Sequence, residues 1–168
     1  MFKAIVAAAA MLIAAPVAAQ ENMPSDRAIL PAGQFQWQPE MSPEGFIRIH
    51  INLRSQMAYV YRNEVLIGLS NISSGMSRYE TPTGIFAISY KNANHRSREY
   101  HGAAMPFAQF FIAERGIALH AGVTPGRRAS HGCVRLPREF ARLLFAETQR
   151  GDMVEIVDES PDLELALR

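Results

Sequence analysis

From residue 46 onward, apolar and polar side chains alternate with a period of two, and this pattern constrains the fold more than any other feature. Ile47, Ile49 and Ile51 are separated by polar residues. Side chains on a strand point alternately to its two faces, so the pattern indicates a half-buried strand. Similar short runs follow at 57–61, 65–72, 85–90, 107–113, 116–120 and 153–157, and turn residues separate several of them. We therefore expect a mainly β domain.

One helix is predicted, beginning at Pro137. Proline is well suited to a first helical position, and Phe140, Leu143 and Leu144 fall at helical spacing on one face. Gly151 is placed to end the run. Because only one helix is predicted, we expect a mainly β domain with a minor α+β character.

Residues 1–19 have the pattern of a secretory signal peptide. Lys3 gives a positive start, residues 4–15 are almost all apolar, and residues 16–19 offer the small side chains that a signal peptidase reads. The run is too short for a comfortable membrane span, and no later stretch approaches the roughly 18 apolar residues that one needs. An uncleaved amphipathic helix would show polar residues at helical spacing, which this segment lacks. We expect export to the periplasm and no transmembrane anchor.

Cleavage after residue 19 removes Lys3 from 17 basic residues and leaves 16, against 16 acidic ones. This balance gives no reason to expect a nucleic acid or an anionic membrane as partner. The remaining chain of about 149 residues suits one domain. Residues 20–44 are rich in proline and lack periodicity, which predicts a flexible or irregular arm anchored by Phe35 and Trp37. The domain is expected over 45–158, with a tail at 159–168.

Cys133 is the only cysteine, in the segment Ser-His-Gly-Cys-Val-Arg at 130–135. A thiol without a disulfide partner is exposed to oxidation outside the cell, so its presence asks for a chemical reason, and nucleophilic catalysis is the best one. His120, at the end of an apolar run, can approach it across a loop and is favoured as the base. His131 is better suited to orienting groups or polarising a carbonyl. Gly132 lets the backbone approach a substrate closely.

Two other interpretations of these residues exist. Cys133 would be a buried structural cysteine beside a surface histidine, or a zinc ligand together with His120 and His131. No fourth zinc ligand is obvious in the sequence. We expect neither a metal nor a cofactor.

His120 followed by Ser-His-Gly-Cys resembles the signature of the L,D-transpeptidase catalytic domain, the YkuD-type fold of bacterial cell-wall enzymes. The similarity extends upstream through Ser74-Gly75 and the Thr-Pro-Thr-Gly-Ile-Phe segment at 81–86, and downstream through 134–157. It thus covers roughly residues 46 to 158. The resemblance implies an L,D-transpeptidase-like β-sandwich or barrel whose helix follows the catalytic cysteine.

The resemblance also implies a transferase that acts in cell-wall organisation, on peptidoglycan stem peptides. Cys133 would attack the peptide bond after the third, diamino-acid residue, release D-Ala, and pass the acyl group to an amine of a second stem peptide or a protein. His120 would be the general base, oriented by the backbone carbonyl at Ala121. His131 and the Cys133 N–H would form the oxyanion site, and Ser130 would fix the loop.

Only nine residues separate His120 from Ser130, fewer than in many members, so we expect a different acceptor surface here. Arginines at 127, 128, 135 and 138 surround this loop, and arginine is suited to the carboxylates of stem peptides. Arg135, inside the motif, is favoured as substrate-binding. Arg127 and Arg128 are candidates for the same role, with solvated surface positions as the alternative.

Two rival functions share parts of this pattern. Water in place of the amine would make the chain an L,D-carboxypeptidase or an amidase that hydrolyses stem-peptide linkages, with the same nucleophile and base. A non-catalytic wall-binding module would need neither Cys133 nor two histidines. We therefore favour the transpeptidase.

Overall fold

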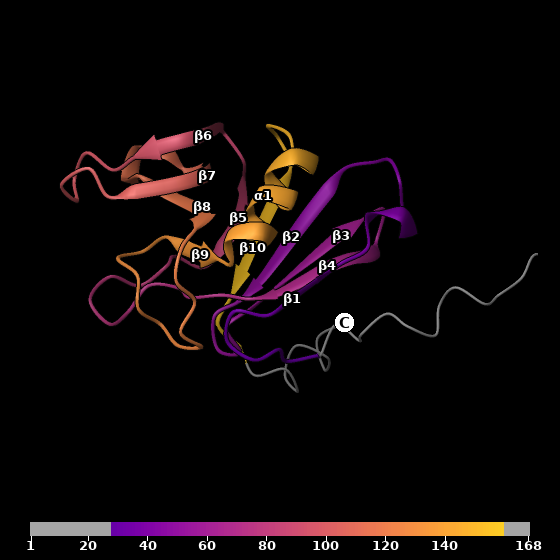
Figure 1. Cartoon of the computed structure of the whole chain (residues 1–168), viewed down its shortest axis with the longest axis horizontal. Helices are drawn as coiled ribbons and strands as arrows, with labels where there is room; N and C mark the ends of the chain where they lie inside the picture. The colour runs from indigo at the N-terminus through magenta and orange to yellow at the C-terminus, as the bar shows by residue number, and fades with distance from the viewer. Residues whose placement is uncertain (1–27, 160–168) are drawn as a thin grey trace, which may run out of the picture.

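The computed structural model describes residues 28–159 (Figure 1). The elements are, in chain order, β1 (Phe35–Trp37), a 3-10 turn (Pro39–Met41), β2 (Ile47–Asn52), β3 (Met57–Arg62), β4 (Val65–Asn71), β5 (Gly84–Ala87), β6 (Tyr90–Arg96), β7 (Ala104–Ile112), a 3-10 turn (Ala113–Arg115), β8 (Ile117–Ala121), β9 (Val134–Leu136), α1 (Arg138–Glu147) and β10 (Met153–Val157). The mainly β class with one helix after Cys133 is confirmed.

The larger sheet has six strands in the order β1-β4-β3-β2-β10-β5. β2 and β10 run parallel, and the other neighbours are antiparallel. Ile47, Ile49 and Ile51 of β2 are buried in the core between the sheets, as predicted. The expectation of a half-buried strand is wrong, because His50 and Asn52 on the other face are buried as well. The last strand begins and ends where the sequence predicted it.

The smaller sheet has four strands in the order β6-β7-β8-β9. β8 and β9 are parallel, and Leu119 lies opposite Val134. Figure 1 shows this sheet beside the larger one, with α1 between them in the view and overlapping β10 of the larger sheet. The two sheets form a β-sandwich, as expected.

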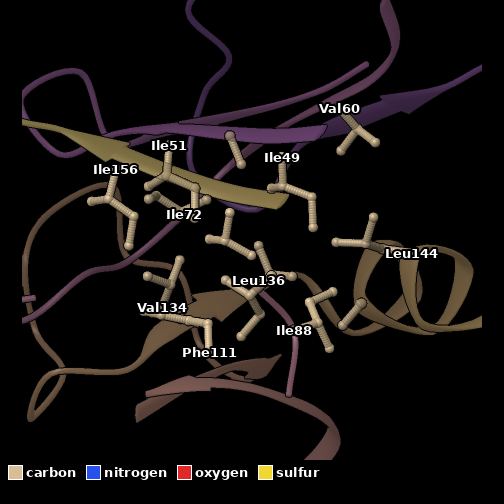
Figure 2. Close-up of a cluster of buried hydrophobic side chains, with 14 of the residues drawn as sticks. Ile49, Ile51, Val60, Ile72, Ile88, Phe111, Val134, Leu136, Leu144 and Ile156 are labelled. Atoms are coloured by element: carbon tan, nitrogen blue, oxygen red, sulfur yellow. The ribbon is translucent and has the colours of Figure 1, made fainter. Parts of the chain in front are cut away.

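The core lies between the two sheets (Figure 2). Ile49, Ile51, Val60 and Ile156 come from the larger sheet, Phe111, Val134 and Leu136 from the smaller one, and Leu144 from α1. Burying a side chain of this size contributes about 1.5–3 kcal/mol. The core therefore fixes β9, and with it the residue just before this strand, Cys133.

The helix is shorter than predicted. Pro137 is its N-cap residue, Phe140, Ala141 and Leu144 are buried, and the Thr148 N–H donates to the Leu144 carbonyl at the C-terminal end. The Lys91 ammonium donates to the Phe145 carbonyl at 2.7 Å and also to that of Thr148. These carbonyls at the end of α1 have no N–H partner within the helix. The Lys91 ammonium from β6 binds them instead, and the helix ends before Gly151.

The arm that was expected to be flexible contains a strand. β1 pairs with β4, and the rings of Phe35 and Trp37 lie 5.6 Å and 5.5 Å from that of Phe140. The Trp37 ring also lies where a side chain at Gly68 would otherwise be. These contacts make 35–37 a part of the sandwich. Residues 20–27, like the predicted signal peptide at 1–19, lie outside the described residues.

Two further strands are absent from the sequence prediction. β6 covers the first half of the polar stretch 91–102, and β9 begins directly after Cys133. β6 is an edge strand with exposed or half-buried residues, so no hydrophobic alternation marks it. β9 has only three residues. Among residues 28–159 no helix is long and apolar enough to cross a membrane.

Candidate active site

The alternation of β8 and β9 places His120, Cys133 and Arg135 on the same side of the smaller sheet. Leu119 and Val134 are buried in the main core, so their neighbours in the chain point to the opposite face. His120 lies directly opposite Arg135 in the parallel register. The face turned away from the core therefore carries the predicted nucleophile and base.

His120 is held in one tautomer by its neighbour. Its Nδ1 lies 2.8 Å from the carbonyl oxygen of Ala121, the contact that the resemblance implied. A carbonyl oxygen only accepts hydrogen bonds, so Nδ1 carries the proton and donates it. Burial lowers the pKa of His120 to about 4, and the ring is neutral at pH 7. Its Nε2 therefore keeps a free electron pair that accepts a proton.

The sulfur of Cys133 is partly buried in a small apolar cluster formed by Met105, Ala108, Phe110 and Ala118. Its thiol donates to the carbonyl of Gly116 over 3.6 Å. Burial raises the pKa of Cys133. The resting pair is thus a neutral thiol and a neutral imidazole.

A set of hydrogen bonds fixes the loop that precedes the sulfur. The Ser130 hydroxyl donates to the Cys133 carbonyl and accepts the Gly132 N–H at 3.2 Å. Gly132 has a φ of 109°, a conformation that strongly favours glycine. Ser130 therefore has the loop-fixing contacts that were expected of it.

The loop is also tied to the strand-turn-strand upstream. The buried Thr81 hydroxyl donates to the Gly132 carbonyl at 2.8 Å and accepts the Gly75 N–H at 2.9 Å. A Cβ on Gly75 would lie 2.0 Å from the carbonyl oxygen of Tyr79. These contacts give the Ser-Gly and Thr-Pro-Thr-Gly segments a structural role at the site.

His131 is exposed and lies between two tyrosine rings. The ring centroid of Tyr79 is 4.6 Å from that of His131, and the centroid of Tyr100 is 4.9 Å away. Tyr79 comes from the turn before β5, and Tyr100 from the loop between β6 and β7. Two segments distant in sequence thus orient this imidazole.

Two cavities meet at the sulfur. The first, here called the Phe110 cavity, has a volume of about 350 Å³ and is lined by residues that include His95 and Phe110. The second, the Val123 cavity, has a volume of about 370 Å³ and is lined by residues that include His120 and Val123. Cys133 and His131 line both. A group on the sulfur is therefore reachable from two sides.

The arginines do not all reach this site. Arg135 lines the Val123 cavity, and its side chain lies across Gly122. Arg128 instead donates to the Asp158 carboxylate at 2.7 Å and to the Leu53 carbonyl at 3.3 Å. Arg127 and Arg128 line neither cavity. The structure thus places Arg135, but not these two, beside Cys133.

A metal site was the other interpretation of the two histidines and the cysteine. Within residues 28–159, no three side chains of the His, Cys, Asp and Glu types are grouped so that they could hold a metal ion.

Comparison with protein-family models shows to which family the chain belongs. The model of the L,D-transpeptidase catalytic domain family, YkuD, matches residues 47–156, more than half of the chain. The chain belongs to this family. No curated protein sequence matches it.

Solved L,D-transpeptidases share the fold. The structure from Stackebrandtia nassauensis has a TM-score of 0.63 and 24% identity, over 70% of this chain and 58% of that one. The structure from Xylanimonas cellulosilytica has a TM-score of 0.61 and 24% identity, over 68% and 61%. L,D-transpeptidase 3 from Mycobacterium tuberculosis, in complex with a faropenem-derived adduct, has a TM-score of 0.60 and 19% identity, over 67% and 60%. The chain spans less than two thirds of the length of each.

Several residues at this candidate site were missed in the sequence. Tyr100 and His95 lie in the polar stretch 91–102, where no periodicity pointed to an element. The β6–β7 hairpin carries them to Cys133. The clue available was composition, because histidine, serine, tyrosine and charged residues gather there in a short segment.

Proposed function

We propose that this chain is a cysteine-dependent L,D-transpeptidase that acts on peptidoglycan stem peptides. The observation that carries the proposal is the position of Cys133 at the junction of two cavities, with a neutral, oriented imidazole on the same face of the sheet. Membership of the family supports the substrate class. The role of each residue follows from its contacts.

The first step forms the acyl-enzyme. Among the described hydrogen bonds none joins the Cys133 sulfur to His120, so the thiol turns from the Gly116 carbonyl toward Nε2 when substrate binds. His120 takes the thiol proton as the sulfur attacks the carbonyl carbon of the diamino-acid residue. The C–N bond then breaks, the proton passes to the departing D-Ala nitrogen, and a thioester remains on Cys133.

The oxyanion that forms in this step needs donors. The Cys133 N–H and the ring of His131 are the groups we assign to it. Hydrogen bonds from Ser130 and Thr81 fix the loop, and two tyrosine rings fix His131, so these donors are in place before substrate arrives. Such preorganised donors contribute about 3–4 kcal/mol each in acyl-transfer enzymes.

The second step passes the acyl group to an amine. The amine nitrogen attacks the thioester carbon, the C–S bond breaks, the amine loses a proton and the thiol is restored. A sulfur open to two cavities suits this reaction, because donor and acceptor enter from different sides. Hydrolysis by water, as in an L,D-carboxypeptidase or an amidase, needs only one opening.

Arg135 is the residue that we assign to a donor carboxylate. It is the only Lys, Arg, Asp or Glu side chain among the described residues that line the Val123 cavity. Its planar guanidinium suits a carboxylate. Arg127 and Arg128, outside both cavities, are left with surface roles.

Incubation of the purified protein with disaccharide-tetrapeptide, followed by mass analysis, tests the proposal. A crosslinked dimer is expected from wild type and none from Cys133→Ala. A tripeptide product alone would favour the carboxypeptidase, and unchanged substrate would contradict both. Export to the periplasm, proposed from residues 1–19, places the enzyme in the compartment of this substrate, and N-terminal sequencing of the secreted protein tests it.

A further inference from the structure

His95 is a third histidine at the site, on edge strand β6 opposite Met105. Its half-buried ring packs edge-on against Phe110, with centroids 4.9 Å apart. It lines the Phe110 cavity together with Cys133. In residues 28–159 no hydrogen bond engages either ring nitrogen of His95. The ring is thus held in place by packing while its nitrogens stay available to a bound group.

His95 and His120 approach the sulfur from different sides. His120 lines the Val123 cavity and not the Phe110 cavity, and the reverse holds for His95. Cys133 therefore lies between one imidazole in each cavity.

The charges of the two cavities differ. The Phe110 cavity is lined by Arg98, Arg115, Glu99 and Glu114, whereas the Val123 cavity has Arg135 and no described carboxylate. Mixed charge suits an amine that also carries a carboxylate, and a lone arginine suits an anionic donor. The amine acceptor accordingly belongs in the Phe110 cavity.

We propose that His95 is the acceptor-side base of the transfer step, an inference that rests on the proposed function. As the neutral amine nitrogen attacks the thioester carbon, its proton passes to a ring nitrogen of His95. The C–N bond forms, the C–S bond breaks, and the sulfur leaves as a thiolate. The proton that His95 took from the amine then passes to this thiolate, which restores the resting thiol and the neutral His95 ring. His120 serves the acylation step, and His95 serves the step that follows it.

Separate measurement of the two steps tests this assignment. Acyl-enzyme formation is followed by rapid quench and intact mass with disaccharide-tetrapeptide, and its transfer is followed with added glycine as the amine. His95→Gln is expected to lower the transfer rate at least tenfold more than the acylation rate, since general-base catalysis contributes about 10²–10⁴-fold. His101→Gln is the matched control, because His101 lies in the loop that follows β6 and lines neither cavity.

Chemical rescue separates a base from a structural ring. His95→Ala leaves space for a small ring, so added imidazole is expected to restore transfer to glycine in this variant and not to change His101→Gln. Equal loss of both steps in His95→Gln, transfer equal to that of His101→Gln, or no rescue would overturn the assignment. If one of these results is obtained while the wild-type protein still forms the acyl-enzyme, only the assignment of His95 fails and the proposed function stands. If the wild-type protein never forms the acyl-enzyme, the proposed function and the assignment of His95 both fail.

Discussion

Thr81→Val removes the hydroxyl that binds the loop before Cys133 and keeps the shape of the side chain. The hydroxyl joins the Gly75 N–H to the Gly132 carbonyl, and all three residues are buried. Valine leaves both backbone groups without this partner. An unsatisfied buried group costs about 1–3 kcal/mol, so we expect the free energy of unfolding to fall by about 2–4 kcal/mol.

Thr83→Val is the matched control, because Thr83 lies in the same turn but is exposed. Denaturant unfolding and thermal melting of the two variants measure the difference. For a domain of this size, 2–4 kcal/mol corresponds to a loss of roughly 6–15 °C in Tm. Turnover well below Tm should also fall on the order of tenfold or more, since the peptide before Cys133 is no longer fixed. A Thr81→Val protein within about 0.5 kcal/mol of Thr83→Val would refute the reasoning.

Three further outcomes follow from the same geometry. The pKa of His120 falls from about 6.5 in the unfolded chain to about 4 in the fold, so its contribution is present above pH 6.5 and is lost toward pH 4. Denaturant titrations should show wild type losing about 3 kcal/mol relative to His120→Gln over this range, and parallel pH profiles would contradict the burial argument. Because burial raises the pKa of Cys133, its alkylation by iodoacetamide should rise with pH to an inflection above that of free cysteine, and a plateau at neutral pH would instead show a thiolate–imidazolium pair. Arg135→Lys keeps the charge but loses the planar donor, so kcat/KM should drop roughly tenfold to a hundredfold without a change in Tm; unchanged kinetics would remove the carboxylate-binding role.

The resting state suggested by these pKa shifts differs from an activated cysteine. A neutral thiol resists oxidation better than a thiolate does, which would suit the lone cysteine of a protein that is exported as we propose. The nucleophile would then be generated only when a substrate brings the sulfur to His120. Slow alkylation and efficient acylation in the same protein would be the signature of this arrangement.

The sequence predicted the parts of the fold that hydrophobic periodicity controls. The apolar residues at every second position of β2 and of the strand at 153–157 are buried in the core, and these contacts decide the structure. β6 has no such pattern because it is a polar edge strand. The predicted helix runs past the observed end of α1 at Glu147. The sequence does not show that Lys91 of β6 binds the carbonyls at the C-terminal end of this helix.

Some residues of the candidate site could be predicted from the sequence, and others are brought there only by the fold. Cys133 and His120 could be selected from residue type and spacing, since their chemistry is specific. His95, Tyr79 and Tyr100 could not, because only the β6–β7 hairpin brings His95 and Tyr100 to the cavities at Cys133, and only the turn before β5 brings Tyr79 to His131. The sequence leaves Arg128 as a candidate for the role favoured for Arg135, because its contact with Asp158 depends on the position of the end of β10.

The covalent intermediate on Cys133 is the central claim, and peptide mapping of the trapped acyl-enzyme tests it most directly. Wild-type protein quenched during turnover of disaccharide-tetrapeptide should carry the disaccharide-tripeptide acyl group on the peptide that contains Cys133. The adduct should disappear when an amine acceptor is added, and Cys133→Ala should carry none. Product formation at the wild-type rate by folded Cys133→Ala, or an adduct on another residue, would contradict the account.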